Sequence, residues 1–191
     1  MEAKIQINDY LTRVAETTNK LNRDDINALA HEIYETYKSD NNIFIFGNGG
    51  SASASSHLAC DLNKGVSYGK HKKFHAHSLT DNMATITAYA NDTSYDEVFI
   101  EQLKNFLNPG DLVIAISGSG NSKNVIKAIE YANSKGNRTA GLTGYDGGKL
   151  KKLAMLSVDA NVNDMEISED IHLIVCHTIK NVFMNLLKDE K

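Results

Sequence analysis

Hydrophobic residues recur at helical spacing over the first part of the chain, from residue 5 to residue 38. This spacing predicts two amphipathic helices separated by a break at residues 22–24, with Asp24 or Asp25 capping the second helix. No strand precedes either helix, so both are expected to pack on something outside a simple sheet layer. The apolar stripes consist of Ile7, Tyr10, Leu11, Val14 and Leu21 in the first helix and Ile26, Leu29, Ile33 and Tyr37 in the second.

Beyond residue 42 the pattern changes to short apolar runs that alternate with longer helical stretches. Strands that alternate with helices favour an α/β fold with a parallel sheet covered on both faces. No composition shift or repeat marks a second domain, so residues 1–191 are expected to form a single domain. The predicted strands are residues 43–46, 74–79, 112–116, 138–142 and 156–162. The predicted helices are a stretch that ends near residue 63, residues 81–107 with a break at 91–92, residues 122–134 and residues 166–187.

The composition is that of an ordinary globular protein, with 41% hydrophobic and 23% charged residues. The net charge of −4 provides no basic field that would favour nucleic acid. No apolar run approaches the roughly 20 residues of a membrane-spanning helix, and the polar N-terminus lacks the apolar segment of a signal peptide. Two cysteines are too few for a disulfide framework. We therefore expect a cytoplasmic protein without a nucleic-acid or membrane partner.

The loop at residues 117–122, with the sequence SGSGNS, lies between the clearest buried strand and a helix. A helix N-terminus offers free N–H groups and the positive end of the helix dipole. Glycines let the backbone approach a phosphate, and serine hydroxyls add donors. The loop lacks the lysine of a nucleotide P-loop, which disfavours a nucleoside triphosphate. We expect Ser117, Gly118, Ser119 and Ser122 to bind a phosphate; the alternative is a plain turn in which Ser122 only caps the helix.

A second loop, GNGGS at residues 47–51, follows the first predicted strand in the same way. It lacks the third glycine of a dinucleotide-binding fingerprint, and alone it could be a tight turn. Ligands of parallel sheets bind at the carboxyl ends of strands, where two such loops would meet at one crevice. The pair is therefore more specific than either loop, and it adds Asn48, Gly49, Gly50 and Ser51 to the expected site.

Titratable residues on two predicted helices are further candidates. His57 and Asp61 are four residues apart, so they share a helix face, where they could bind a metal, transfer protons or form a surface polar pair. Glu169 and His177 are eight residues apart, about 80° around a straight helix, and cannot be close neighbours on it. The spacing alone leaves the roles of all four open.

Five segments then occur in a characteristic order: GNGGSASASSH at 47–57, AND at 90–92, ISGSGNSKNVIKAI at 116–129, LTGYDGGKL at 142–150 and EDIHLIVCH at 169–177. Together they resemble the phosphoheptose isomerase family of sugar isomerase (SIS) domain proteins. The resemblance implies a three-layer fold with a five-stranded parallel sheet flanked by helices, and two extra N-terminal helices. It also implies a homotetramer with active sites at subunit interfaces. Residues 1–40 would serve oligomer packing, and residues 41–191 would form the sugar-phosphate-binding core.

The resemblance further implies an aldose–ketose isomerase that interconverts sedoheptulose 7-phosphate and D-glycero-D-manno-heptose 7-phosphate through an enediol. Asp61 and His177 match the two acid–base positions, without an indication of which is acid and which is base. A divalent metal, most simply zinc, would be held by His57, Asp61, Glu169 and His177. The implied substrate contacts are Asn48, Gly49, Gly50, Ser51, Asn91, Asp92, Ser117, Gly118, Ser119, Ser122 and Glu169.

This sequence departs from the family pattern at Asp61, where glutamate is usual, and at Glu169, where glutamine is usual. The carboxylate of Asp61 is one methylene shorter, and a displacement of about 1 Å can lower a rate about a hundredfold. Residues 62–65 also differ from the usual run. Two other functions stay open: a non-catalytic adaptor related to the protein that binds the replication initiator DnaA, and a phosphosugar-sensing regulatory module. The acid–base candidates at positions 61 and 177 favour the enzyme.

Overall fold

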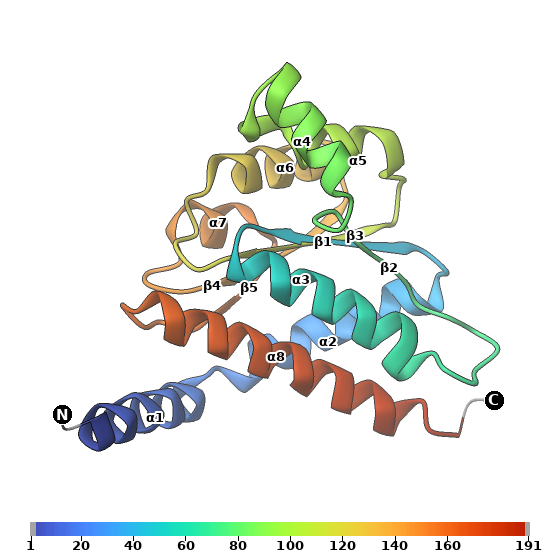
Figure 1. Cartoon of the computed structure of the whole chain (residues 1–191). Coiled ribbons are helices and arrows are strands. Elements are labelled where there is room, and N and C mark those ends of the chain that lie inside the picture. The colour runs from blue at the N-terminus through green and yellow to red at the C-terminus, as the bar shows by residue number, and fades with distance from the viewer. Residues whose placement is uncertain (1–2, 190–191) are drawn as a thin grey trace.

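The computed structural model describes residues 3–189 and centres on a five-stranded parallel sheet (Figure 1). The strand order is β2-β1-β3-β4-β5, so the order reverses between β1 and β3. Ligands of open α/β sheets bind at such a switch point, beyond the carboxyl ends of the strands. The strands are β1 (Asn42–Gly47), β2 (His75–Ser78), β3 (Leu112–Ser117), β4 (Arg138–Thr143) and β5 (Leu156–Asp159).

Helices cover both faces of the sheet, which confirms the predicted three-layer α/β fold (Figure 1). One face packs against α2, α3 and α8, and the other packs against α4, α5, α6 and α7. Among residues 3–189, no helix is long and apolar enough to cross a bilayer. The helices are α1 (Ala3–Lys20), α2 (Arg23–Lys38), α3 (Gly50–Cys60), α4 (Met83–Asp92), α5 (Ile100–Phe106), α6 (Lys123–Ser134), α7 (Gly148–Leu153) and α8 (Met165–Leu186). Two short helices, the π-helix η1 (Asp61–Val66) and the 3₁₀-helix η2 (Tyr95–Glu97), connect them.

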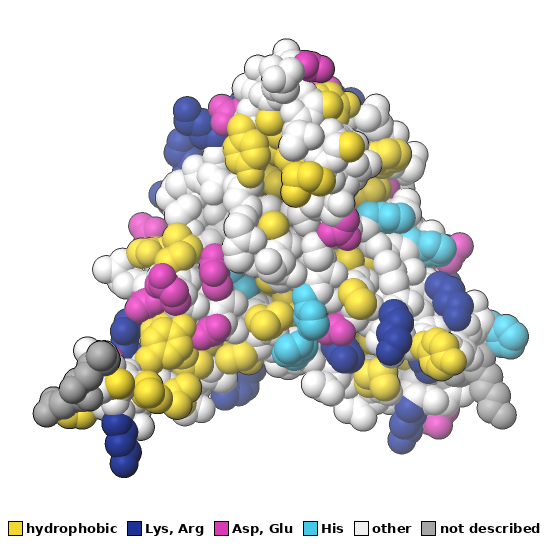
Figure 2. Space-filling model, viewed as in Figure 1, with side chains coloured by type: hydrophobic (Ala, Val, Ile, Leu, Met, Phe, Trp, Pro, Cys, Tyr) yellow, Lys and Arg dark blue, Asp and Glu magenta, His cyan; other side chains and the backbone are white. Residues whose placement is uncertain are grey.

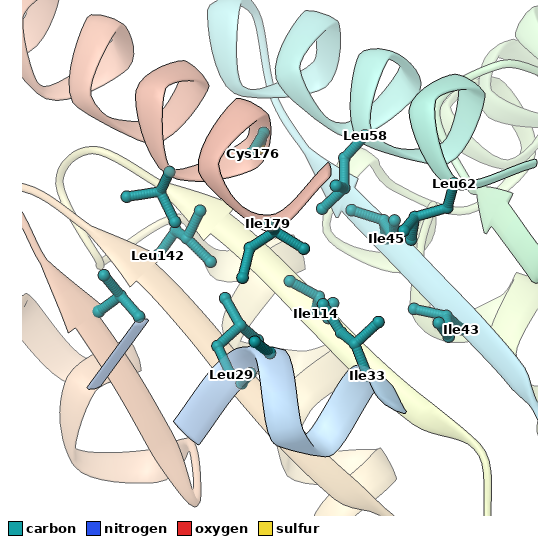
Figure 3. Close-up of a cluster of buried hydrophobic side chains, with 14 of the residues drawn as sticks. Leu29, Ile33, Ile43, Ile45, Leu58, Leu62, Ile114, Leu142, Cys176 and Ile179 are labelled. Atoms are coloured by element: carbon teal, nitrogen blue, oxygen red, sulfur yellow. The ribbon is translucent and has the colours of Figure 1, made fainter. Parts of the chain in front are cut away.

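The two layers of helices bury both faces of the central strands. Successive side chains of a strand point to opposite faces, so each strand contributes to two cores. In β1, Ile45 belongs to one core and Phe46 to the other. Leu58 from α3 and Ile179 from α8 share the core of Ile45 (Figure 3). Each such side chain contributes about 1.5–3 kcal/mol when it is buried. This packing holds α3 and α8 side by side, and it thereby positions the polar residues on their outer faces.

Several elements differ in detail from the prediction. Asn22, rather than Asp24 or Asp25, caps α2, because its side chain accepts a hydrogen bond from the N–H of Asp24 at 3.0 Å. The fifth strand ends at Asp159, because Asn161 turns the chain with a φ of 50°. The short helix α7 was not predicted, since its six residues are too few to show a helical period.

The first helix, α1, projects from the body and contacts α8 (Figure 1). Tyr10 donates a hydrogen bond to Asp170 at 2.7 Å, and Arg13 forms an ion pair with Asp164 at 2.7 Å. The bond to Asp170 raises the pKa of Tyr10 to about 12. Figure 2 shows apolar side chains gathered around this end of the molecule. The large apolar side chains of α1 that are more than half exposed are Ile5, Ile7 and Leu11.

Candidate active site

Two loops meet at the carboxyl ends of β1 and β3. The glycine loop (residues 47–51) leads from β1 into α3, and the serine loop (residues 117–122) leads from β3 into α6. As expected from the sequence, both loops line one small cavity, of about 150 Å³. Its lining consists of Asn48, Ser51, Ile116, Ser117, Gly118, Ser119, Ser122 and Met165. The switch point of the sheet therefore carries a polar cavity, lined by Asn48 and Ser51 from the glycine loop and by three serines from the serine loop.

The serine loop owes its shape to Gly120. This residue has a φ of 62°, in the left-handed region, and its N–H donates to the carbonyl of Ser117 at 3.0 Å. A Cβ here would lie 2.1 Å from the carbonyl oxygen of Gly147, so there is no room for a side chain. Ser122 is the N-cap of α6, yet its hydroxyl makes no capping hydrogen bond and lies 3.5 Å from the hydroxyl of Ser117. Both hydroxyls are thus placed at the positive end of a helix, where an anion is favoured.

The side chain of Asn48 is anchored to the protein. Its amide exchanges two hydrogen bonds with the amide of Asn124, at 2.9 and 3.0 Å, and Tyr95 donates to the same Oδ1 at 2.9 Å. Asn124 is buried in the first turn of α6, so these bonds tie the glycine loop to the helix that follows the serine loop. Sequence reasoning missed the roles of Asn124 and Tyr95, because a lone polar side chain in a helix has no distinguishing spacing.

Glu169 reaches the glycine loop from α8. A Cβ at Gly50 would lie 2.1 Å from the carboxylate oxygen Oε2 of Glu169, so a side chain here would displace that carboxylate. Glu169 is partly buried, and burial, followed by the charges of Glu166 and Asp170, raises the pKa of its carboxyl group. Gly49, the residue before Gly50, is the N-cap of α3 and has a φ of 56°. The carboxylate of Glu169 therefore belongs to the glycine-loop side of the site.

The histidine cluster, formed by His57, Asp61 and His177, lies where α3 and η1 pack beside α8. The Nε2 atoms of the two histidines are 2.8 Å apart, and Nε2 of His57 is 3.3 Å from Oδ2 of Asp61. Both imidazoles are exposed, whereas Asp61 is buried. Lys180, one turn after His177, places its Nζ 3.2 Å from Oδ1 of Asp61. One chain thus brings together two histidines that are 120 positions apart in the sequence.

The histidine cluster fits a divalent metal ion. One ligand atom of each of its three residues lies within 4.8 Å of the other two. Oδ2 of Asp61 is buried, and no residue between 3 and 189 donates a hydrogen bond to it. A buried carboxylate oxygen without a donor is unfavourable unless a cation or proton accompanies it. Two imidazoles and a carboxylate are also a donor set suited to zinc, with a position left open. Glu169, the fourth predicted ligand, lies outside this cluster.

Asn91 and Asp92 do not line the cavity between the two loops. They end α4, both are exposed, and the amide of Asn91 donates to Oδ1 of Asp92 at 2.8 Å. Asp92 instead lines a separate cavity of about 400 Å³, together with Tyr89. The expected contact of these two residues with the ligand stays a prediction.

Comparison with known proteins gives consistent matches over most of the chain. The family model described as SIS domain matches residues 6–144. A probable phosphoheptose isomerase from Thermoplasma acidophilum is 39% identical over 170 residues, which cover 89% of this chain and 93% of that protein. The phosphoheptose isomerase of Aliarcobacter butzleri is 39% identical over 153 residues, 80% of each chain. The solved phosphoheptose isomerase from Neisseria gonorrhoeae has a TM-score of 0.88 at 24% identity, covering 96% of this chain and 99% of that one, and it shares the fold.

Proposed function

Because the chain belongs to the SIS-domain family, and within it to the phosphoheptose isomerases, we propose that it interconverts sedoheptulose 7-phosphate and D-glycero-D-manno-heptose 7-phosphate. The arrangement along α3 supports this most. Ser51 lines the cavity between the loops, and His57 lies about 9 Å further along the helix axis at 1.5 Å per residue. A substrate with its phosphate and its carbonyl at opposite ends of an open chain suits this separation.

The serine loop holds the phosphate in this proposal. Hydroxyl groups of Ser117, Ser119 and Ser122 donate to the phosphate oxygens, and the N-terminal end of α6 favours the negative charge. The glycine loop supplies the opposite wall through Gly49, Gly50 and Ser51. Asn48 keeps that wall in place through its bonds to Asn124. Asn91, Asp92 and Glu169 are proposed to contact the sugar itself.

Asp61 and His177 carry the proton transfers. One of them removes the proton from the carbon next to the carbonyl and produces an enediol, and the other moves protons between the two oxygens. Oδ2 of Asp61 has no competing donor within the described residues, so it is free to take a proton. His177 shares a short contact with His57, and one imidazole of such a pair can donate while the other accepts.

His57, Asp61 and His177 would also hold a divalent metal, which we propose to be zinc. When bound, such an ion polarises the carbonyl and stabilises negative charge on the enediolate. Glu169 was expected as a fourth ligand, but its carboxylate lies against Gly50. We therefore propose three protein ligands, with Glu169 facing the sugar.

We further propose a homotetramer with active sites completed at subunit interfaces. Residues 1–40 would serve oligomer packing and residues 41–191 would form the binding core of the single domain, because α1 exposes an apolar stripe that needs a partner. Light scattering at micromolar concentration should give about four times the mass of one chain. A mass near the 21.0 kDa of one chain would contradict this assembly. A cytoplasmic location is proposed because both cysteines, Cys60 and Cys176, are free thiols.

The test of the function is turnover on a panel of seven- and six-carbon sugar phosphates. Isomerisation of sedoheptulose 7-phosphate, faster than that of the six-carbon compounds, is expected. Binding of sugar phosphates without turnover would instead favour the sensing module or the adaptor.

A further inference from the structure

The two oxygens of the Asp61 carboxylate have different surroundings. Oδ1 lies 3.2 Å from Nζ of Lys180, and Oδ2 lies 3.3 Å from Nε2 of His57. Within residues 3–189, no donor makes a hydrogen bond to Oδ2. A carboxylate can rotate about its last bond and exchange its oxygens, so an ion pair on one oxygen fixes where the other points. Lys180 therefore pairs with Oδ1, and Oδ2 faces the histidine side.

The side chain of Lys180 passes close to Gly65, which has no side chain to meet it. Gly65 is four residues after Asp61, in the π-helix η1. A Cβ at Gly65 would lie 3.1 Å from Cε and 3.8 Å from Nζ of Lys180, and 3.5 Å from Oδ1 of Asp61. The lysine stem therefore passes over the bare backbone of Gly65 to reach the carboxylate. A methyl group here would press on Cε of the lysine stem, which would have to shift by a few tenths of an ångström, while Oδ1 of Asp61 would stay at ordinary contact distance.

Lys180 belongs to the same face of α8 as His177, because the two are three residues apart. The packing of α8 against η1 therefore brings both the imidazole of His177 and the ammonium group of Lys180 close to Asp61. This geometry differs from that of a plain surface pair, in which both side chains extend into water and contribute little. Asp61 is buried, and the side chain of Lys180 is only 34% exposed.

We propose that Lys180 is a positioning residue for the isomerisation: it holds Oδ1 of Asp61, aims Oδ2 at the reacting atoms, and reaches the carboxylate across the backbone of Gly65. This inference rests on the proposed isomerase function. It predicts that replacement of Lys180 slows the chemical step without weakening substrate binding, since Lys180 acts through Asp61.

The experiment compares Lys180→Met, Lys180→Arg and Gly65→Ala with the parent protein. Lys180→Met should lower kcat about ten- to a hundredfold with KM within about twofold, as expected for a misplaced catalytic group. Lys180→Arg should recover part of this loss, because it restores a cation. Gly65→Ala should also lower kcat. When it is combined with Lys180→Met, kcat should fall little further, since both changes act on the same contact between Lys180 and Asp61. Lys64→Met, which replaces an exposed lysine next to Gly65, is the matched control and should retain the parent kcat.

The outcomes separate this inference from the proposed function. An unchanged kcat in Lys180→Met, or a raised KM with unchanged kcat, overturns the inference while the function stands. A parent protein that turns over none of the sugar phosphates refutes the function. In that case a crystal structure of Lys180→Met decides the positioning role: the carboxylate of Asp61 should rotate away from His57, and an unchanged carboxylate overturns the inference.

Discussion

The serine loop and the histidine cluster belong to one candidate site but are built in different ways. The loop is contiguous, and its shape comes from a single strand-to-helix connection with a left-handed residue at Gly120. The cluster takes His57 and Asp61 from α3 and η1 and His177 from α8, so it exists only while these helices pack together. Ligand binding therefore depends on local backbone geometry, whereas proton transfer depends on tertiary packing. It should therefore be possible to disrupt either the serine loop or the histidine cluster by substitution without disrupting the other.

The largest effect is expected from changes in the histidine cluster. Asp61→Asn and His177→Ala should each lower turnover by about 100- to 10,000-fold, the range of general acid–base catalysis. Affinity for the sugar phosphate, measured by titration calorimetry, should stay close to that of the parent, because the serine loop is untouched. His31→Ala, at an exposed histidine on α2, is the control. Parent-like turnover in both cluster variants would show that the catalytic assignment is wrong.

Two glycines, one in the serine loop and one outside it, test how the serine loop depends on its backbone geometry. Gly120 and Gly136 both have positive φ, of 62° and 76°, but a Cβ at Gly120 would meet the oxygen of Gly147 whereas one at Gly136 would meet nothing within 4 Å. Gly136→Ala should lower the free energy of unfolding by about 1–2 kcal/mol, the cost of a left-handed alanine. Gly120→Ala should lower the free energy of unfolding by about 2 kcal/mol more than Gly136→Ala does, and it should also abolish phosphate binding. Urea unfolding and calorimetry measure the two effects. Equal losses in the two variants would exclude a special role for the contact with Gly147.

Smaller changes are expected when single hydroxyls of the serine loop are removed. Ser119→Ala and Ser122→Ala should each weaken sugar-phosphate binding by about 1.5–3 kcal/mol, the contribution of one charge-assisted hydrogen bond. Affinity for the dephosphorylated sugar should be unaffected. Ser134→Ala, at the far end of α6, is the control. If the parent protein bound the phosphorylated and dephosphorylated sugars equally well, the loop would not be a phosphate site.

The difference between the two halves also explains what the sequence could predict. The strands, the paired loops and the shared face of His57 and Asp61 follow from short-range patterns, and the structure contains all three. The meeting of His177 with Asp61 could be expected only from the resemblance to a family, because no spacing links residues on separate helices. The anchoring of Asn48 by Asn124, and the contact of Lys180 with Asp61, had no signal in the sequence. Both arise from the packing of elements far apart in the chain.

The smallest expected effect concerns a second histidine on α8. His172 is buried, and burial lowers its pKa from 6.5 to about 4, although the backbone of Thr143 and the charge of Asp159 oppose this. The unfolded chain therefore takes up a proton on this imidazole at a higher pH than the folded chain does. Stability from this group is fully present above about pH 6.5 and is lost as the pH falls toward 4, by about 2 kcal/mol between about pH 7 and about pH 5.

His172→Gln should remove that part of the pH dependence, because the amide does not titrate. The free energy of unfolding, measured in urea at several pH values, should fall less steeply below about pH 6.5 in this variant than in the parent, even if the variant is less stable at neutral pH. His31→Gln, at an exposed histidine on α2, is the control. An unchanged slope in His172→Gln would mean that His172 is protonated in the fold or reached by water. A reduced slope would establish that His172 is held without a proton in the core, whereas His177, five residues further along the same helix, lies exposed in the histidine cluster.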